Sequence, residues 1–257
     1  MSLSDISLTP QPGAATRTRA VLSTAALEVR LMMRNGEQLL LTLGIPVLML
    51  IGLSTLHFIN LGPGKAINWA TPGVLTLAVM STAFTAQAIS TGFDRRSGAI
   101  TFLGSTPLGR GGLLAGKTLA VIAIELVQFA IIVPIAFALG WQPHGDPISA
   151  IVYIVLGTAA FTALGIALAG ALRAEAVLAV ANAIWLVLLL VGGVIIPLDK
   201  LPHGLALIAA GTPSGALGAG LRSVLVHGDS LAGWPVLVLL AWFALGVGIA
   251  VKTFKWD

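Results

Sequence analysis

Long apolar stretches alternate with short polar ones along the chain, as in helices that cross a lipid bilayer. A spanning helix needs about 20 mostly apolar residues to cross ~30 Å of hydrocarbon. The apolar stretches lie at about residues 39–58, 72–91, 118–139, 148–172, 176–196 and 235–251. The pattern therefore predicts an all-α integral membrane protein with six transmembrane helices.

Two further segments carry different patterns. Residues 17–38 alternate apolar side chains with charged ones, which predicts an amphipathic helix along the membrane surface. An inner extension of the first span is the alternative. Residues 201–226 are apolar but are broken by Pro202, Pro213 and several glycines. Broken backbone is tolerated in a membrane only where protein or water satisfies it, so we expect a re-entrant or interfacial hairpin between the fifth and sixth spans.

The composition excludes a soluble domain. Of 257 residues, 57% are hydrophobic and 9% are charged, whereas soluble domains carry roughly 25% charged residues. The absence of cysteine excludes disulfides, thiol chemistry and zinc–thiolate sites. The four histidines show no ligand spacing, so we expect no metal site in this chain.

The basic residues predict the orientation of the chain. Six crossings place both termini on one side, and cytoplasmic loops carry an excess of Lys and Arg. The basic residues on the predicted inner face are Arg17, Arg19, Arg30, Arg34, Arg95, Arg96, Arg110, Lys117, Arg173, Lys252 and Lys255. Only Lys65, Lys200 and Arg222 fall on the other face. We therefore expect a multi-pass protein of the cell membrane with cytoplasmic termini, and no nucleic-acid partner despite the net charge of +4.

The domain organisation follows from the same pattern. Residues 1–16 lack the features of a secretory signal peptide and contain Pro10, Pro12 and Gly13, so we expect a disordered cytoplasmic tail. Residues 17–257 are then one transmembrane domain.

Residues 111–118 match the phosphate-loop pattern G-x-x-x-x-G-K-[ST] but lack its context. A true phosphate loop follows a buried strand in an α/β domain. Here residues 105–110 read as a turn, and a membrane helix follows. We therefore expect no nucleotide site. Lys117 would instead anchor the inner end of the third span, with the glycines letting the chain bend into it.

The longest polar break on the inner face covers residues 92–117. Residues 94–97 form a charged entry, and Phe93, Ile100, Phe102 and Leu103 provide a short apolar stripe around it. This favours a short helix parallel to the membrane that presents a surface to a soluble partner. A solvated loop is the alternative.

These residues resemble the ABC-2 type permease family, most closely the actinobacterial daunorubicin/doxorubicin resistance permeases. The resemblance lies in Phe93-Asp94-Arg95-Arg96-Ser97-Gly98, in residues 103–110 and in residues 114–117. It extends over nearly the whole chain, through Pro46, Asn182, Gly192-Gly193 and Leu221-Arg222. Asp94 stands where a glutamate is more usual in the family.

The resemblance implies a half-transporter without its own ATPase site. Two permease copies, identical or related, would form the pathway within the lipid, and a separate ATPase subunit would bind ATP and Mg. It also implies that the ATPase contacts residues 92–117, which we call the coupling loop. The coupling residues expected from the resemblance are Phe93, Asp94, Arg95, Arg96, Ser97, Gly98 and Phe102. The cargo would be an amphipathic drug or lipid-like molecule that moves outward.

Several polar residues lie inside the predicted spans. Glu125, Gln128, Gln87 and Asn182 would either line the translocation pathway or form interhelical hydrogen bonds that fix packing. The alanines at 159, 163, 167 and 171 predict a close helix contact within the chain. Pro197, Pro202 and Pro213 would belong to an outer gate.

Two other functional classes receive less support from the sequence. An ion-coupled secondary transporter would depend on Glu125, the one acid placed inside a span. An intramembrane enzyme would need clustered acids and histidines or a Ser/Lys pair at one depth, and no HExxH or similar group occurs.

Overall fold

The computed structural model describes residues 16–55, 62–104, 106, 108–231 and 233–253. All secondary structure over these residues is helical. The expected tail, apart from its last residue, lies outside the described residues, as does Lys255.

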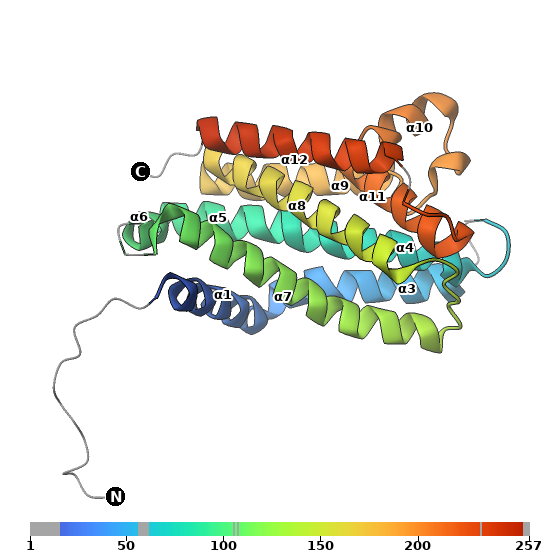
Figure 1. Ribbon diagram of the computed structural model, residues 1–257, viewed down its shortest axis with the longest axis horizontal. Coiled ribbons are helices and arrows are strands. Elements are labelled where there is room, and N and C mark those ends of the chain that lie inside the picture. Colours follow the sequence, from blue (N-terminus) through green and yellow to red (C-terminus); the bar gives the residue numbers. More distant parts are fainter. Residues whose placement is uncertain (1–15, 56–61, 105, 107, 232, 254–257) are drawn as a thin grey trace, which may run out of the picture.

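Five helices are long and apolar enough to cross a membrane (Figure 1). One is continuous from Ala66 to Arg96 and comprises α4 (Ala66–Val79), the π-helical η3 (Met80–Ala86) and α5 (Gln87–Arg96). The others are α7 (Gly109–Ala138), α8 (Pro147–Ala171), α9 (Ala174–Val191) and α12 (Gly233–Thr253). They lie side by side along the long axis of the molecule.

The first predicted span is shorter than expected over the described residues. It consists of α2 (Gly36–Leu39), the π-helical η2 (Leu40–Gly44) and α3 (Ile45–Thr55). The apolar part of this helix, Thr42–Thr55, falls below the length of a full crossing. Residues 56–61, where the span was expected to end, lie outside the described residues.

The segment between the last two spans is a bent pair of helices. A short turn, η4 (Leu198–Lys200), precedes α10 (His203–Ala210), and α11 (Pro213–Arg222) continues as the π-helical η5 (Ser223–His227). The pair is bent by 97°. If it is counted as one span, the described chain has up to six. The fold is therefore that of an all-α integral membrane protein with about six spanning helices.

The most extensive helix contact joins α8 and α12. A Cβ placed on Gly246 of α12 would lie 2.9 Å from the backbone carbon and from the Cβ of Ala163 on α8. The small side chains along α8 thus allow α12 to approach its backbone, as small-residue faces do in membranes.

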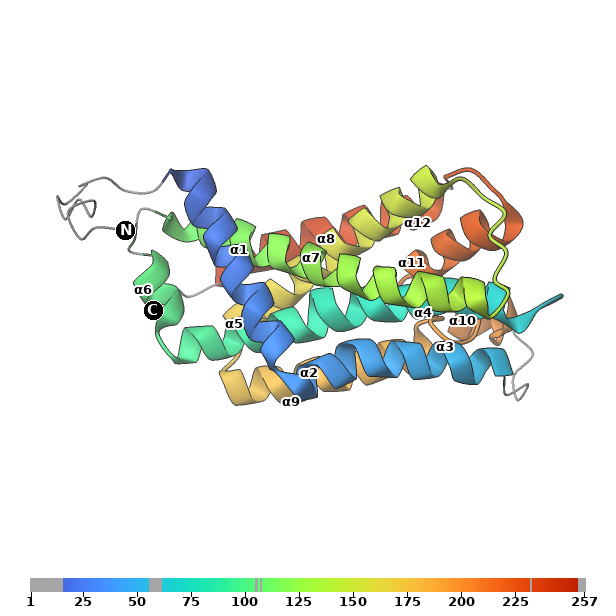
Figure 2. The same cartoon turned by 90° about the horizontal axis from the view of Figure 1, so that it is seen from below.

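The helix α1 (Arg17–Arg34) lies across the inner part of α7 (Figure 2). Glycines permit this approach, because a Cβ on Gly112 would lie 3.5 Å from Val21 and one on Gly116 would lie 2.9 Å from Thr24. The expectation that glycines bend the chain at residues 111–116 is wrong, since α7 is continuous from Gly109. The phosphate-loop lookalike is therefore helical.

One end of the bundle gathers the elements that carry most of the basic residues. The start of α1, the end of α5, the start of α7, the start of α9 and the end of α12 all lie there, together with the short helix α6 (Ala99–Gly104) (Figure 1). We call this the inner end, following the orientation that the basic residues predict.

Candidate functional site

The expected coupling loop is mostly helical. Phe93, Asp94, Arg95 and Arg96 form the last turn of α5, and not part of a separate surface helix as expected. Gly98 then reverses the chain with a positive φ of 75°, a conformation that glycine adopts without strain. The separate short helix is α6 alone. Residues 93–96 belong to α5 because the helix of the second span continues past the point where its apolar stretch ends.

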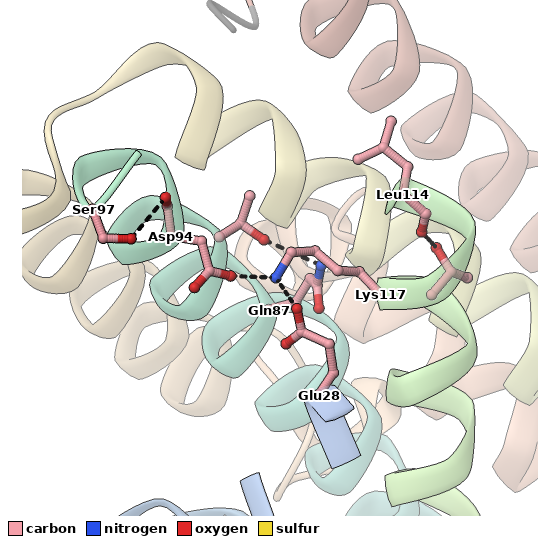
Figure 3. Close-up of polar contacts among 8 residues, drawn as sticks. Glu28, Gln87, Asp94, Ser97, Leu114 and Lys117 are labelled. Atoms are coloured by element: carbon pink, nitrogen blue, oxygen red, sulfur yellow. Dashed lines mark hydrogen bonds and ion pairs between the residues drawn. The ribbon is translucent and has the colours of Figure 1, made fainter. Parts of the chain in front are cut away.

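A buried lysine joins three helices at the inner end (Figure 3). The Lys117 Nζ atom of α7 lies 2.7 Å from Glu28 Oε1 on α1 and 2.5 Å from Asp94 Oδ2 on α5. The Lys117 side chain is 2% exposed. A buried ammonium is tolerated when it is paired and hydrogen-bonded, so these carboxylates fix the junction. We call these three residues the ion triad.

The two arginines of the coupling motif bind within the chain. Arg95 donates to the backbone carbonyls of Gly170, at 2.5 Å, and of Leu172, at the end of α8. Such contacts satisfy carbonyls that a helix end leaves unpaired. Arg96 pairs with Glu175 in the first turn of α9, and both side chains are exposed. These residues therefore tie α5 to the α8–α9 connection.

The two faces of α6 differ. Ile100 is 1% exposed and packs with Leu108 and Leu113, and Val21 of α1 packs against the same cluster. Phe102, two residues further on, is 71% exposed. Among the expected coupling residues, Phe102 and the exposed Phe93 thus present apolar surface outward, whereas Asp94 and Arg95 contact other helices of the chain.

A cavity of about 400 Å³ lies between the first span, the second span and α9. Its lining comprises Asn35, Thr42, Ile45, Ser81, Thr85, Ala86, Ile89, Leu178, Asn182 and Trp185. We call it the polar cavity. Trp185 Nε1 donates to Ser81 Oγ at 2.9 Å, and Thr85 Oγ1 is buried without a hydrogen-bond partner. Of the polar residues expected in the pathway, Asn182 lines this cavity.

Glu125 and Gln128 connect α7 to its neighbours. Glu125 Oε2 accepts a hydrogen bond from Thr158 of α8 at 2.7 Å. Gln128 Nε2 donates to the carbonyl of Thr42 at 2.6 Å, and its Oε1 accepts from Thr82 at 3.0 Å. Both residues are buried and contact other helices directly, and neither is a lining residue of the polar cavity, although Thr42, which accepts from Gln128, is one.

The remaining pathway candidate, Gln87, also lies outside the polar cavity. Its Nε2 donates to Thr91 Oγ1 at 3.2 Å, one turn along the same helix (Figure 3). The structure therefore does not bring the four pathway candidates together at one site.

Arg222, near the opposite end of the bundle, has a structural role that the sequence did not predict. Arg222 is 4% exposed and donates to the carbonyls of Gly193 at 2.7 Å and Val194 at 2.5 Å. It holds the turn that follows α9. Two features of the sequence could have indicated this role. One is the pair Gly192-Gly193, and the other is a single arginine in an apolar segment, because such an arginine usually needs a buried partner.

The three expected gate prolines stand at helix starts. Pro197 and Pro202 are the N-cap residues of η4 and α10, and Pro213 is the first residue of α11. Thr212 caps α11 by accepting from Gly215 N at 3.0 Å.

Over the described residues there is no group of acids and histidines that could hold a metal ion.

The described chain is thus a bundle of apolar helices with a cavity between the first two spans and α9 and with the short helix α6 at one end. The profile of the ABC-2 type transporter family matches residues 20–226, and the chain belongs to that family. A search of curated proteins finds no match. ABC-2 permease domains are transmembrane subunits of ABC transporters, generally without an ATPase site, and the family implies a partner ATP-binding subunit in general.

Proposed function

We propose that this chain is the permease subunit of an ATP-binding-cassette exporter. It resides in the cell membrane with both termini in the cytoplasm. It moves an amphipathic drug or lipid-like molecule outward, using ATP that a separate subunit binds with Mg and hydrolyses. The family supports the permease role, and the charge distribution of the inner end supports the orientation.

This proposal rests on one observation about α6: one of its side chains is exposed and another is packed against two longer helices. Its exposed Phe102 offers an apolar side chain of the kind that anchors protein interfaces. Its buried Ile100 is packed with residues of α7 and α1. A partner that holds Phe102 therefore moves α6, and the packing around Ile100 passes that movement to two longer helices.

The ion triad would pass the movement of α6 on to the membrane-spanning helices. Lys117 connects α7 with Glu28 of α1 and Asp94 of α5. A displacement at the inner end therefore moves α1 and the inner ends of two spans, α5 and α7, together. A second permease copy, identical or related, completes the pathway between the subunits. The turn held by Arg222, together with α10 and α11, forms the outer gate.

Copurification with a candidate ATPase tests the role of α6. We expect Phe102→Ala to lower ATPase retention at least about tenfold, since an apolar anchor contributes on the order of 2 kcal/mol or more to binding. Phe137→Ala is the matched control, because Phe137 is also an exposed aromatic residue but lies near the other end of α7. It should leave retention unchanged.

Two outcomes would contradict the proposal. One is that the Phe102→Ala complex assembles and hydrolyses ATP in a cargo-stimulated manner like the unaltered protein. The other is that the chain alone, in liposomes, transports cargo in response to a proton gradient, as an ion-coupled secondary transporter would.

A further inference from the structure

We propose that a groove between α1 and α7 binds an anionic phospholipid of the inner leaflet. The headgroup phosphate would pair with Arg30, and an acyl chain would lie against α7. This lipid would be a resident ligand of the protein and not its cargo, so the inference goes beyond the proposed function. The groove has a volume of about 560 Å³. We call it the lipid groove.

The lipid groove is apolar except for one residue. Leu22 and Val29 lie on its α1 wall, and Ile122 and Leu126 lie on its α7 wall. Leu22 is 56% exposed and Leu126 is 63% exposed, so both side chains are open to a ligand. Every described lining residue apart from Arg30 has an aliphatic side chain. Such walls accept an acyl chain, because they offer no partner to a polar group.

The lipid groove begins beside α1 and continues towards the centre of the bundle. The helix α1 crosses α7 obliquely at the inner end (Figure 2). The two helices approach closely at Gly112 and Gly116. On α7 the groove extends further from the inner end, from Leu119 to Leu126, a length of about 10 Å along the helix axis. A lipid whose headgroup lies beside α1 would therefore direct its chain along this wall into the bilayer.

Arg30 is the one charged residue among the described lining residues, and its side chain is exposed. The ion pairs of the described residues are those of Lys117 and Arg96, so Arg30 has no carboxylate partner among them. A guanidinium binds phosphate oxygens in a bidentate manner, and its aliphatic stem can follow apolar surface while the charge stays at headgroup level. Arg30 is therefore placed to bind a phosphate at the edge of an apolar groove.

The charges of α1 favour an anionic headgroup. The helix carries four arginines and a single acid, Glu28, which pairs with Lys117. Arg19 and Arg34 are 11 and 4 residues from Arg30, close to whole numbers of helical turns, so the three arginines share one side of α1. Basic residues at a membrane surface attract anionic lipids, whereas a zwitterionic headgroup offsets its phosphate with its own cation. An anionic lipid should therefore bind in preference to a zwitterionic one.

A second apolar cavity provides a comparison within the same chain. It lies between α7, α8 and α12, has a volume of about 430 Å³, and its described lining residues are uncharged. This cavity could hold an acyl chain, but its described lining offers no charge that would distinguish one headgroup from another. Of these two sites, only the lipid groove should select an anionic lipid.

Photolabelling of the purified chain in dodecyl maltoside tests the site without an ATPase or ATP. The probe is phosphatidylglycerol bearing a diazirine on one acyl chain. The competitors are unlabelled phosphatidylglycerol, phosphatidylcholine with the same chains, and glycerol 3-phosphate, which has the phosphate but no chain. We expect labelling within residues 119–126. Phosphatidylglycerol should compete at least about fivefold more effectively than phosphatidylcholine, and glycerol 3-phosphate should not compete.

Two charge variants test the role of Arg30. Arg30→Gln should reduce the advantage of phosphatidylglycerol to less than about twofold, because the neutral side chain no longer pairs with the phosphate. Arg19→Gln is the matched control. It removes the same charge from the same helix, but Arg19 is about 16 Å from Arg30 along the helix axis and is not a lining residue of the groove. Salt screens a charge at that distance, so the advantage should remain about fivefold.

A third variant tests the position of the acyl chain. Ala123 borders the lipid groove, so Ala123→Trp should fill the groove and abolish labelling within residues 119–126. The apparent melting temperature of each variant without added lipid should match that of the unaltered protein, which separates loss of the site from loss of the fold.

The inference is overturned if labelling maps to the cavity between α7, α8 and α12, or if the two phospholipids compete equally well for the unaltered protein. It is also overturned if Arg30→Gln behaves like Arg19→Gln, or if glycerol 3-phosphate alone displaces the probe. No ATPase takes part, so any of these results leaves the proposed permease role intact. Conversely, Phe102→Ala should leave the labelling unchanged, so a failed coupling experiment does not affect this inference.

Discussion

Lys117 Nζ lies 2.5 Å from Asp94 Oδ2, which joins the start of the third span to the end of the second. The sequence motif around Asp94 suggested a charge that faces a partner. Instead, Asp94 shares a buried lysine with Glu28 of α1. The pair therefore connects helices within the chain, and among the expected coupling residues Phe93 and Phe102 are the ones that present apolar surface outward.

Replacement of Lys117 should destabilise the contact between α1, α5 and α7. Lys117→Met leaves the two carboxylates facing each other without a cation, so the stability should fall by about 3 kcal/mol. That is the lower end of the range for a broken buried pair, because the Asp94 side chain is 34% exposed. The apparent melting temperature in detergent measures the effect.

A neutral triad is the control for this variant. The combination of Lys117→Met with Glu28→Gln and Asp94→Asn removes the unpaired charges, so it should recover a large part of the lost melting temperature. If the triple variant is no more stable than Lys117→Met, the ion triad does not act as a charged unit.

The contact between α8 and α12 predicts opposite effects at two glycines of one helix. Gly246→Ala should destabilise the protein by about 1–3 kcal/mol, because the new Cβ would lie 2.9 Å from Ala163. Gly248→Ala meets nothing within 4 Å and should be neutral or slightly stabilising. Thermal unfolding of both variants checks this, and equal melting temperatures would mean that the two helices are not in close contact.

The turn after α9 depends on Arg222. Arg222→Lys cannot bond both the Gly193 and Val194 carbonyls with the fixed geometry of a guanidinium, so a loss of about 3 kcal/mol is expected. Gly73→Ala should disturb the same turn, because its Cβ would lie 2.3 Å from the Val194 carbonyl oxygen. Limited proteolysis should cut residues 192–201 faster in both variants. Unchanged cleavage in both would refute the role of Arg222.

The start of α8 has a predictable pH dependence. Hydrogen bonds from the backbone N–H groups of Ile148 and Ser149 lower the pKa of Asp146 from its ordinary value of 3.8. A lowered folded-state pKa contributes stability above the ordinary value, and that contribution is lost as the pH falls through the folded value.

Variants of Asp146 separate the cap from the charge. Asp146→Asn should retain the cap and lose this pH dependence, whereas Asp146→Ala should lower the melting temperature at neutral pH as well. Melting temperatures between pH 7 and pH 3 measure both effects. An Asp146→Asn protein that loses stability in acid as steeply as the unaltered protein would show that another group is responsible.

The apolar stretches predicted the spans because burial in lipid requires length and hydrophobicity, both of which are local in the sequence. The apolar stretches could not show how far a helix continues beyond its apolar part. The second span continues through Phe93 to Arg96, since a charged turn can remain helical beyond the hydrocarbon. The coupling helix was therefore predicted to be longer than α6 is.

Pairing between distant residues could not be predicted from one sequence. Lys117 and Arg222 appeared as isolated basic residues near span ends. The partners of Lys117 lie on two other helices, and those of Arg222 lie in the turn after α9. Glu125 and Gln128 were recognised as polar residues within the membrane. Their separate partners, Thr158 on one side and Thr42 with Thr82 on the other, depend on how the helices pack.

The central claim is that α6 faces the cytoplasm and receives a separate ATPase. The chain has no cysteine, so Phe102→Cys introduces a single thiol. In intact cells this thiol should resist a membrane-impermeant maleimide, and in inside-out vesicles it should react, unless the bound ATPase protects it. Crosslinking should join it to the ATPase. Labelling of the thiol from outside intact cells would contradict the account.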